Sequence, residues 1–107
     1  MTLNWSPHAL SLFSDILDTI FYELSAEDMI RWRHKIEDSA LVLEDYPLSG
    51  TSVPLECFDT IPPNADDLRQ IFCRPYRIVY EIVGNEVHVL SIRHSRMLVT
   101  DSDTFWN

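Results

Sequence analysis

Hydrophobic positions at helical spacing dominate the first half of the chain. Ser6-Pro7 is a pair typical of a helix start, and apolar side chains then recur three or four positions apart. Ser25–Asp28 fits a second helix start, a capping box in which aspartate replaces the usual glutamate, and another apolar stripe covers Met29–Leu43. This helix is expected to end near Tyr46-Pro47, because proline disfavours the helical state of the residue before it. The pattern predicts a hairpin of two helices, each about 18 residues long, with almost no loop between them.

The second half changes to the alternating and β-branched pattern of strands. Residues 48–67 contain several Pro, Gly and Ser residues and are expected to form a long connection with one short extended piece. Three strands are predicted after it, at Leu68–Cys73, Tyr76–Val83 and Glu86–Arg93, and Thr2–Trp5 is a candidate for a further strand.

Gly84-Asn85 is predicted to be a two-residue hairpin loop with the glycine first, as a type II′ turn prefers. Val83 then pairs with Glu86, and one face of the hairpin becomes apolar and is expected to pack on the helices. That face carries Tyr76, Ile78, Tyr80 and Ile82 opposite Arg93, Ser91, Val89 and Val87. On the other face, Glu81 lies across from His88, and His94 is diagonal to Arg77. A polar cluster is therefore expected at one end of the sheet, with Arg69, Arg74 and Arg96 nearby.

The chain has 107 residues with 17 acidic and 8 basic side chains, and a formal charge of -9. The charge is uneven: residues 1–67 hold 13 acids and 3 bases, whereas residues 68–98 hold 2 acids and 5 arginines. The overall acidity argues against a surface that binds nucleic acid across a whole face. No apolar run is long enough to span a bilayer, and the start lacks the features of a signal peptide. A cytoplasmic protein without membrane contact is expected.

Cys57 and Cys73 are too few for a disulfide scaffold and are not spaced as zinc ligands. Free thiols are expected, and a single disulfide bridge between the two cysteines is the alternative. No other spacing indicates a metal, a phosphate loop or a nucleophile triad, so no cofactor is expected.

The predicted polar cluster suggests one chemistry and one structural alternative. A histidine beside an arginine and a carboxylate could carry out acid-base catalysis on a phosphodiester, with Glu81 or His88 as the base. The alternative is that Glu81 and His88 form a cross-strand charge pair and that the arginines flank strands at the surface.

The layout resembles the RelE/ParE toxin superfamily of type II toxin–antitoxin systems over nearly residues 2–98. The matching segments are Trp5-Ser6-Pro7-His8-Ala9, Pro47-Leu48-Ser49-Gly50, Val53-Pro54, Leu68-Arg69, Tyr76–Ile82 and Ile92-Arg93-His94-Ser95-Arg96. The resemblance implies an α+β fold, with a helical hairpin packed on a small, mainly antiparallel twisted sheet. Residues 1–98 would form the toxin domain and residues 99–107 a polar C-terminal tail.

The resemblance also implies three functions. The His94-Ser95-Arg96 ending favours the ParE-like branch, whose members inhibit DNA gyrase by binding and are neutralised by a cognate antitoxin. The first alternative is a RelE-like mRNA endonuclease on the ribosome, which would use Arg77, His94 and Glu81. It is disfavoured by the lack of lysine in the expected groove and of any tyrosine after Tyr80. The second alternative is a non-toxic protein that only binds its antitoxin.

The same resemblance implies where partners bind. The antitoxin would wrap the helical hairpin and extend the sheet, placing carboxylates against arginines. The residues expected to contact a target or antitoxin are Arg69, Arg74, Arg77, Arg93, His94 and Arg96. The sequence does not decide between a homodimer and a toxin–antitoxin hetero-oligomer.

Overall fold

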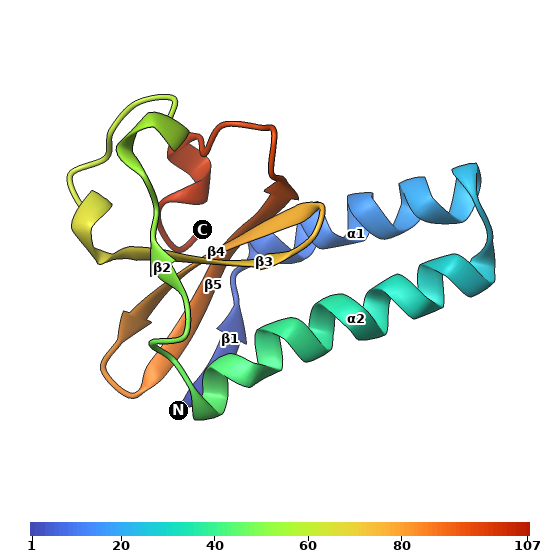
Figure 1. Cartoon of the computed structure of the whole chain (residues 1–107), viewed down its shortest axis with the longest axis horizontal. Coiled ribbons are helices and arrows are strands. Elements are labelled where there is room, and N and C mark those ends of the chain that lie inside the picture. Colours follow the sequence, from blue (N-terminus) through green and yellow to red (C-terminus); the bar gives the residue numbers. More distant parts are fainter.

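Two helices and a five-stranded sheet make up most of the fold, and the computed structural model describes all 107 residues (Figure 1). The helices are α1 (Pro7–Glu23) and α2 (Ala26–Asp45). The strands are β1 (Thr2–Trp5), β2 (Thr51–Ser52), β3 (Leu68–Cys73), β4 (Tyr76–Val83) and β5 (Glu86–His94). Short 3-10 turns cover Leu55–Cys57, Ala65–Asp67 and Asp101–Asp103. The α+β class inferred from the sequence is confirmed, and none of the helices is long and apolar enough to cross a membrane.

Both helices begin at the predicted serines. The Ser6 hydroxyl oxygen accepts a 3.0 Å hydrogen bond from the Ala9 amide, and that of Ser25 accepts a 3.0 Å bond from the Asp28 amide. These bonds satisfy amides that the first turn of a helix leaves without partners. The Ser25 hydroxyl also donates to the Asp28 carboxylate at 2.9 Å. The predicted helical hairpin is confirmed, and Figure 1 shows it projecting well beyond the sheet.

The strand order in the sheet is β1-β5-β4-β3-β2. The first strand lies parallel to β5, and the other pairings are antiparallel. Thr2–Trp5 is therefore a strand, as the sequence suggested, and it lies at one edge of the sheet. In the β4–β5 loop Gly84 has φ +59° and no other residue has a positive φ, which agrees with the predicted type II′ turn.

The predicted hairpin register holds only next to the turn. Val83 pairs with Glu86 and Tyr80 with Val89, as expected, but a β-bulge between Val79 and Tyr80 shifts the later pairs by one residue. His94 consequently lies opposite Tyr76, and Arg93 lies opposite Arg77. A bulge adds one residue to one strand, so every position beyond it changes face relative to an unbulged ladder.

The helices cover one face of the sheet. The larger core between them contains Ala9, Phe13, Ile36, Cys73, Ile78, Val89 and Ile92, and a smaller cluster contains Leu43, Tyr80 and Val87. Six residues of the predicted apolar face lie against these clusters as expected: Tyr76, Ile78, Tyr80, Ile82, Val87 and Val89. The bulge replaces Ser91 on this face by Ile92.

The other face is covered by the long connection and by the end of the chain. A second core there contains Val53, Phe58, Leu68, Val79, Leu90 and Val99. Residues 99–107, which were expected to form a polar tail, pack back on the domain: Val99, Asp103 and Thr104 are buried. Both faces of the sheet are thus buried, although only one is covered by helices.

Cys57 and Cys73 are free thiols. Cys73 belongs to the core under the helices, whereas Cys57 packs against the core on the opposite face. The sheet separates the two sulfurs, so the single bridge left open by the sequence is not formed.

Candidate partner-binding site

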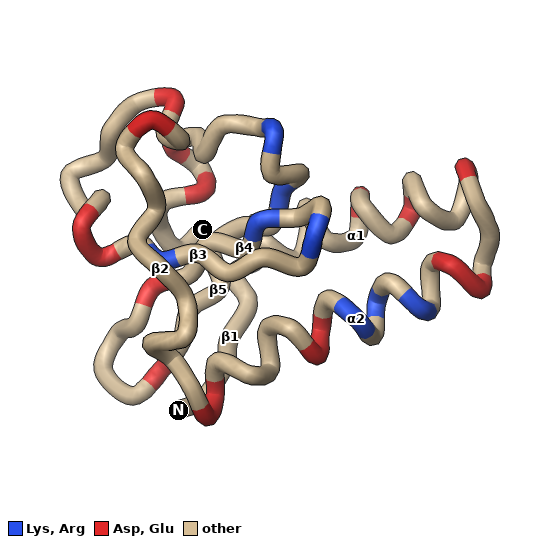
Figure 2. The backbone as a smooth tube through the Cα atoms, in the orientation of Figure 1, with Lys and Arg blue, Asp and Glu red and all other residues tan.

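Two neighbouring turns meet at one end of the sheet and carry its exposed cations. Arg74 lies in the turn between β3 and β4, and Arg96 follows β5. The turns are held together by a 2.8 Å hydrogen bond from the Ser95 amide to the Pro75 carbonyl oxygen. The Arg96 amide donates to Nδ1 of His94 at 3.1 Å, which fixes the second turn. We call Arg74, His94 and Arg96 the basic end; Figure 2 shows blue positions gathered in this region.

The other predicted binding residues have internal partners. Arg69 lies apart from the basic end and donates to the carbonyl oxygens of Leu48 and Gly50 at 3.2 and 2.6 Å. Arg93 forms a 2.8 Å ion pair with the buried carboxylate of Asp103. Arg77 is 8% exposed and donates to the Met97 carbonyl oxygen at 3.2 Å. Among the arginines of the sheet, only Arg74 and Arg96 are both exposed and without a carboxylate partner.

The predicted cluster of Arg77 and His94 on one face is wrong. Because of the bulge, His94 lies with Tyr76 on the helix side, their ring centroids 6.4 Å apart, while the Arg77 guanidinium points to the opposite side. Glu81 is four residues from Arg77 along β4, roughly 13 Å away, and its carboxylate accepts from Asn64 at 3.4 Å. The three residues expected for an endonuclease are therefore not assembled around one point.

Glu81 and His88 lie opposite each other in the ladder, as predicted, but they do not form the predicted charge pair. His88 Nε2 lies 2.8 Å from the Glu86 carboxylate instead, and the His88 ring packs on Trp106 with centroids 4.7 Å apart. The His88 side chain is therefore held by its own strand and by the C-terminal segment.

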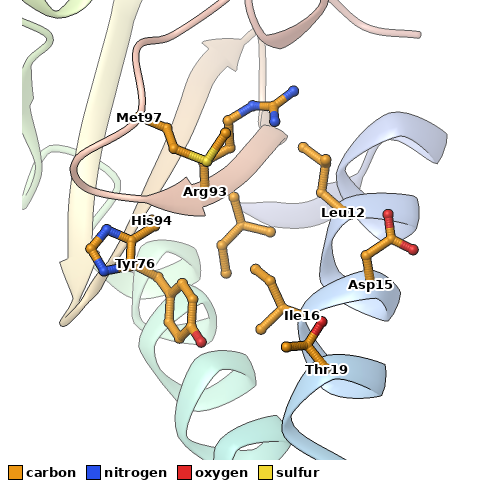
Figure 3. Close-up of a pocket in the computed structure, with 9 residues that line it drawn as sticks. Leu12, Asp15, Ile16, Thr19, Tyr76, Arg93, His94 and Met97 are labelled. Atoms are coloured by element: carbon orange, nitrogen blue, oxygen red, sulfur yellow. The ribbon is translucent and has the colours of Figure 1, made fainter. Parts of the chain in front are cut away.

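A pocket of about 440 Å³ opens between α1 and the basic end (Figure 3). Its lining residues are Leu12, Asp15, Ile16, Thr19, Tyr76, Ile92, Arg93, His94 and Met97. The helix contributes Leu12 and Ile16, and the sheet contributes Tyr76 and Ile92, so the interior is mainly apolar. Polar groups of Asp15 and His94 lie at opposite sides of the opening (Figure 3).

Tyr76 is the hydroxyl-bearing aromatic residue of this pocket. Burial raises the pKa of its phenol, and the nearby Cys73 adds to the rise. The phenol therefore stays protonated at neutral pH and can donate a hydrogen bond but cannot serve as a base. No group of three or more His, Cys, Asp and Glu side chains is placed to hold a metal ion. An apolar pocket beside cations is suited to binding an apolar side chain that is followed by a carboxylate.

Comparison with known proteins agrees with this fold. A solved chain of the chromosomal ParDE TA system from P. aeruginosa superposes with a TM-score of 0.69 at 19% identity, and the match covers 88% of this chain and 95% of that chain. Curated proteins give no match. The family model described as the ParE toxin of type II toxin-antitoxin system, parDE, matches residues 3–99. The chain belongs to the ParE toxin family.

One buried group of this ParE-family chain was missed by the sequence reasoning. Asp103 is fully buried, and its carboxylate accepts from Arg93 Nε, from Thr100 and from His8 Nε2, the last at 2.8 Å. Burial alone would raise the pKa of Asp103, but the bonds from Arg93, Thr100 and His8 outweigh it and lower the pKa. His8, at the start of α1, is thereby tied to the C-terminal segment. The spacing Thr100-x-x-Asp103 forms a capping box and was the signal available in the sequence.

Proposed function

We propose that this ParE-family toxin acts in the bacterial cytoplasm by binding DNA gyrase, and that a cognate antitoxin neutralises it. Family membership supports this proposal, and the observation that carries it against the endonuclease alternative is the separation of Arg77 from His94. Acid-base cleavage of RNA requires a base, an acid and a cation around one phosphate. Here Arg77 is buried on one face and His94 lies on the other.

The charge distribution also favours a discrete protein contact. Broad adhesion to RNA or DNA gains its affinity from many phosphate contacts. This chain has a formal charge of -9, and its free cations on the sheet are confined to the basic end. A compact cationic patch of this kind is suited to a single acidic surface on a protein partner.

The antitoxin would use the pocket at the basic end. An apolar side chain would enter between Ile16 and Ile92, and carboxylates beside it would approach Arg74 and Arg96. Binding energy in such contacts concentrates in a buried anchor, while the surrounding charges direct the approach.

The decisive experiment adds the purified protein to DNA gyrase and measures supercoiling of a relaxed plasmid. We expect inhibition that the cognate antitoxin reverses. A parallel reaction with translating ribosomes should show no cleavage of mRNA.

Cleavage of mRNA by the wild-type protein, abolished in His94→Ala with antitoxin binding retained, would contradict the gyrase proposal. Intact supercoiling together with intact mRNA and normal growth on expression would instead indicate a protein that only binds its antitoxin.

A further inference from the structure

The guanidinium of Arg77 is buried without an anionic partner. The residue is only 8% exposed, its Nε has no hydrogen-bond partner, and none of the ion pairs of the structure includes it. Directly across the ladder lies a second cation, Arg93, whose charge is balanced by Asp103. Like charges opposite one another are destabilising, and a buried charge without a partner is more costly still. The Phe72 ring lies 5.7 Å from Arg77 Cζ but carries no net charge, so a nearby group that can become an anion would stabilise Arg77.

The group that its terminal nitrogen meets is the thiol of Cys57. Arg77 Nη2 lies 3.5 Å from Cys57 Sγ, and Nη1 donates to the carbonyl oxygen of Met97. Of these two partners only the sulfur can become an anion. Cys57 is partly exposed, at the end of the 3-10 turn Leu55–Cys57.

The backbone fixes the sulfur in this position. The Cys57 carbonyl oxygen accepts a 2.8 Å bond from the Val99 amide, and the Val99 carbonyl oxygen accepts from the Asp59 amide at 2.9 Å. Cys57 is thereby held between the C-terminal segment and the sheet, facing Arg77.

We propose that Cys57 is a peroxide-reactive thiol and that Arg77 is the residue that positions and activates it. A cysteine beside a cation is more nucleophilic than an isolated one. The oxidant is a hydroperoxide. The sulfur attacks one peroxide oxygen: an S–O bond forms, the O–O bond breaks, and the sulfur loses two electrons. Cys57 becomes a sulfenic acid, and the other oxygen leaves as an alcohol or water, carrying the thiol proton.

Cys73 provides a matched control in the same chain. It is buried under the helices, where its thiol meets the Lys35 carbonyl oxygen at 3.8 Å. Cys73→Ser leaves Cys57 as the only thiol, and Cys57→Ser leaves only Cys73.

The test measures the alkylation rate with iodoacetamide at pH 6. In the Cys73→Ser protein we expect Cys57 to react about tenfold or more faster than glutathione, and Cys73 in the Cys57→Ser protein to react far more slowly. Adding Arg77→Met should lower the Cys57 rate about tenfold, and Arg77→Lys should restore most of it. Hydrogen peroxide followed by dimedone should give an adduct on Cys57 and none on Cys73.

One measurement needs no arginine variant. Unfolding in urea exposes a thiol, so it raises the alkylation rate of an ordinary, partly buried cysteine. For Cys57 we expect unfolding to lower the alkylation rate instead, because the contact with Arg77 is lost. A rate that rises on unfolding, a rate unchanged in a folded Arg77→Met protein, or the absence of a dimedone adduct would each overturn the proposal.

Discussion

The carboxylate of Asp103 accepts a 2.8 Å hydrogen bond from Arg93 Nε, joining a residue four positions before Asn107 to the last strand of the sheet. His8 Nε2 contacts the other carboxylate oxygen, also at 2.8 Å, which adds the start of α1. Asp103 is fully buried, so these contacts replace its hydration. The C-terminal segment is thereby fixed over the sheet by one charged side chain.

Replacing Asp103 by alanine should therefore be strongly destabilising. The change leaves the Arg93 guanidinium and Thr100 without their acceptor, and we expect a loss of about 3 kcal/mol in the free energy of unfolding. Urea denaturation measures it. Asp101→Ala is the matched control: Asp101 is exposed in the same 3-10 turn and should change stability by less than about 0.5 kcal/mol. Equal effects of the two substitutions would contradict this role for Asp103.

The lowered pKa of Asp103 predicts a specific loss of stability in acid. A group whose pKa is lower in the folded protein stabilises the fold fully above its unfolded pKa, about 3.9 for aspartate. That contribution is lost as pH falls below this value and through the lower folded pKa. Urea midpoints measured from pH 6 to pH 2 should fall more steeply in the wild-type protein than in Asp103→Asn. Parallel curves would show that Asp103 has the same pKa in both states.

The chain's two glycines should respond differently to alanine. At Gly50 an added Cβ would lie 2.5 Å from the Gln70 carbonyl oxygen and 2.6 Å from the Tyr80 hydroxyl oxygen, whereas at Gly84 it would meet nothing within 4 Å. Gly84→Ala suffers only from its φ of +59° and should cost about 1 kcal/mol. Gly50→Ala must displace the buried Tyr80 or the strand and should cost about 2–3 kcal/mol. Urea denaturation of both variants checks this order, and the reverse order would contradict it.

Charge reversal at the basic end should weaken antitoxin binding. Arg74→Glu with Arg96→Glu replaces the two free cations of the sheet with anions, and we expect association to slow about tenfold or more at low salt. Stopped-flow association at two salt concentrations measures the effect, which should shrink at high salt. Thr60→Glu, at an exposed position in the long connection, is the control. An equal loss in the control would show that overall charge, and not this surface, determines the rate.

The helices and the strands could be read from the sequence because their signals are local. Ser6-Pro7 and Ser25 start the two helices, and Gly84-Asn85 sets the first pairs of the β4–β5 ladder. Apolar spacing then selects the face that packs on the helices. The same local signals support the family resemblance, which the match over residues 3–99 confirms.

The composition of the site was decided by the tertiary structure. No sequence signal marks the bulge beside Val79, yet it moves His94 to the helix side and separates it from Arg77. The partners of Asp103 and Cys57 lie far away in the sequence: His8 is 95 positions from Asp103, and Arg77 is 20 positions from Cys57. Sequence periodicity predicts which face of an element is buried, but long-range packing determines which charged groups meet there and which cations remain free to bind a partner.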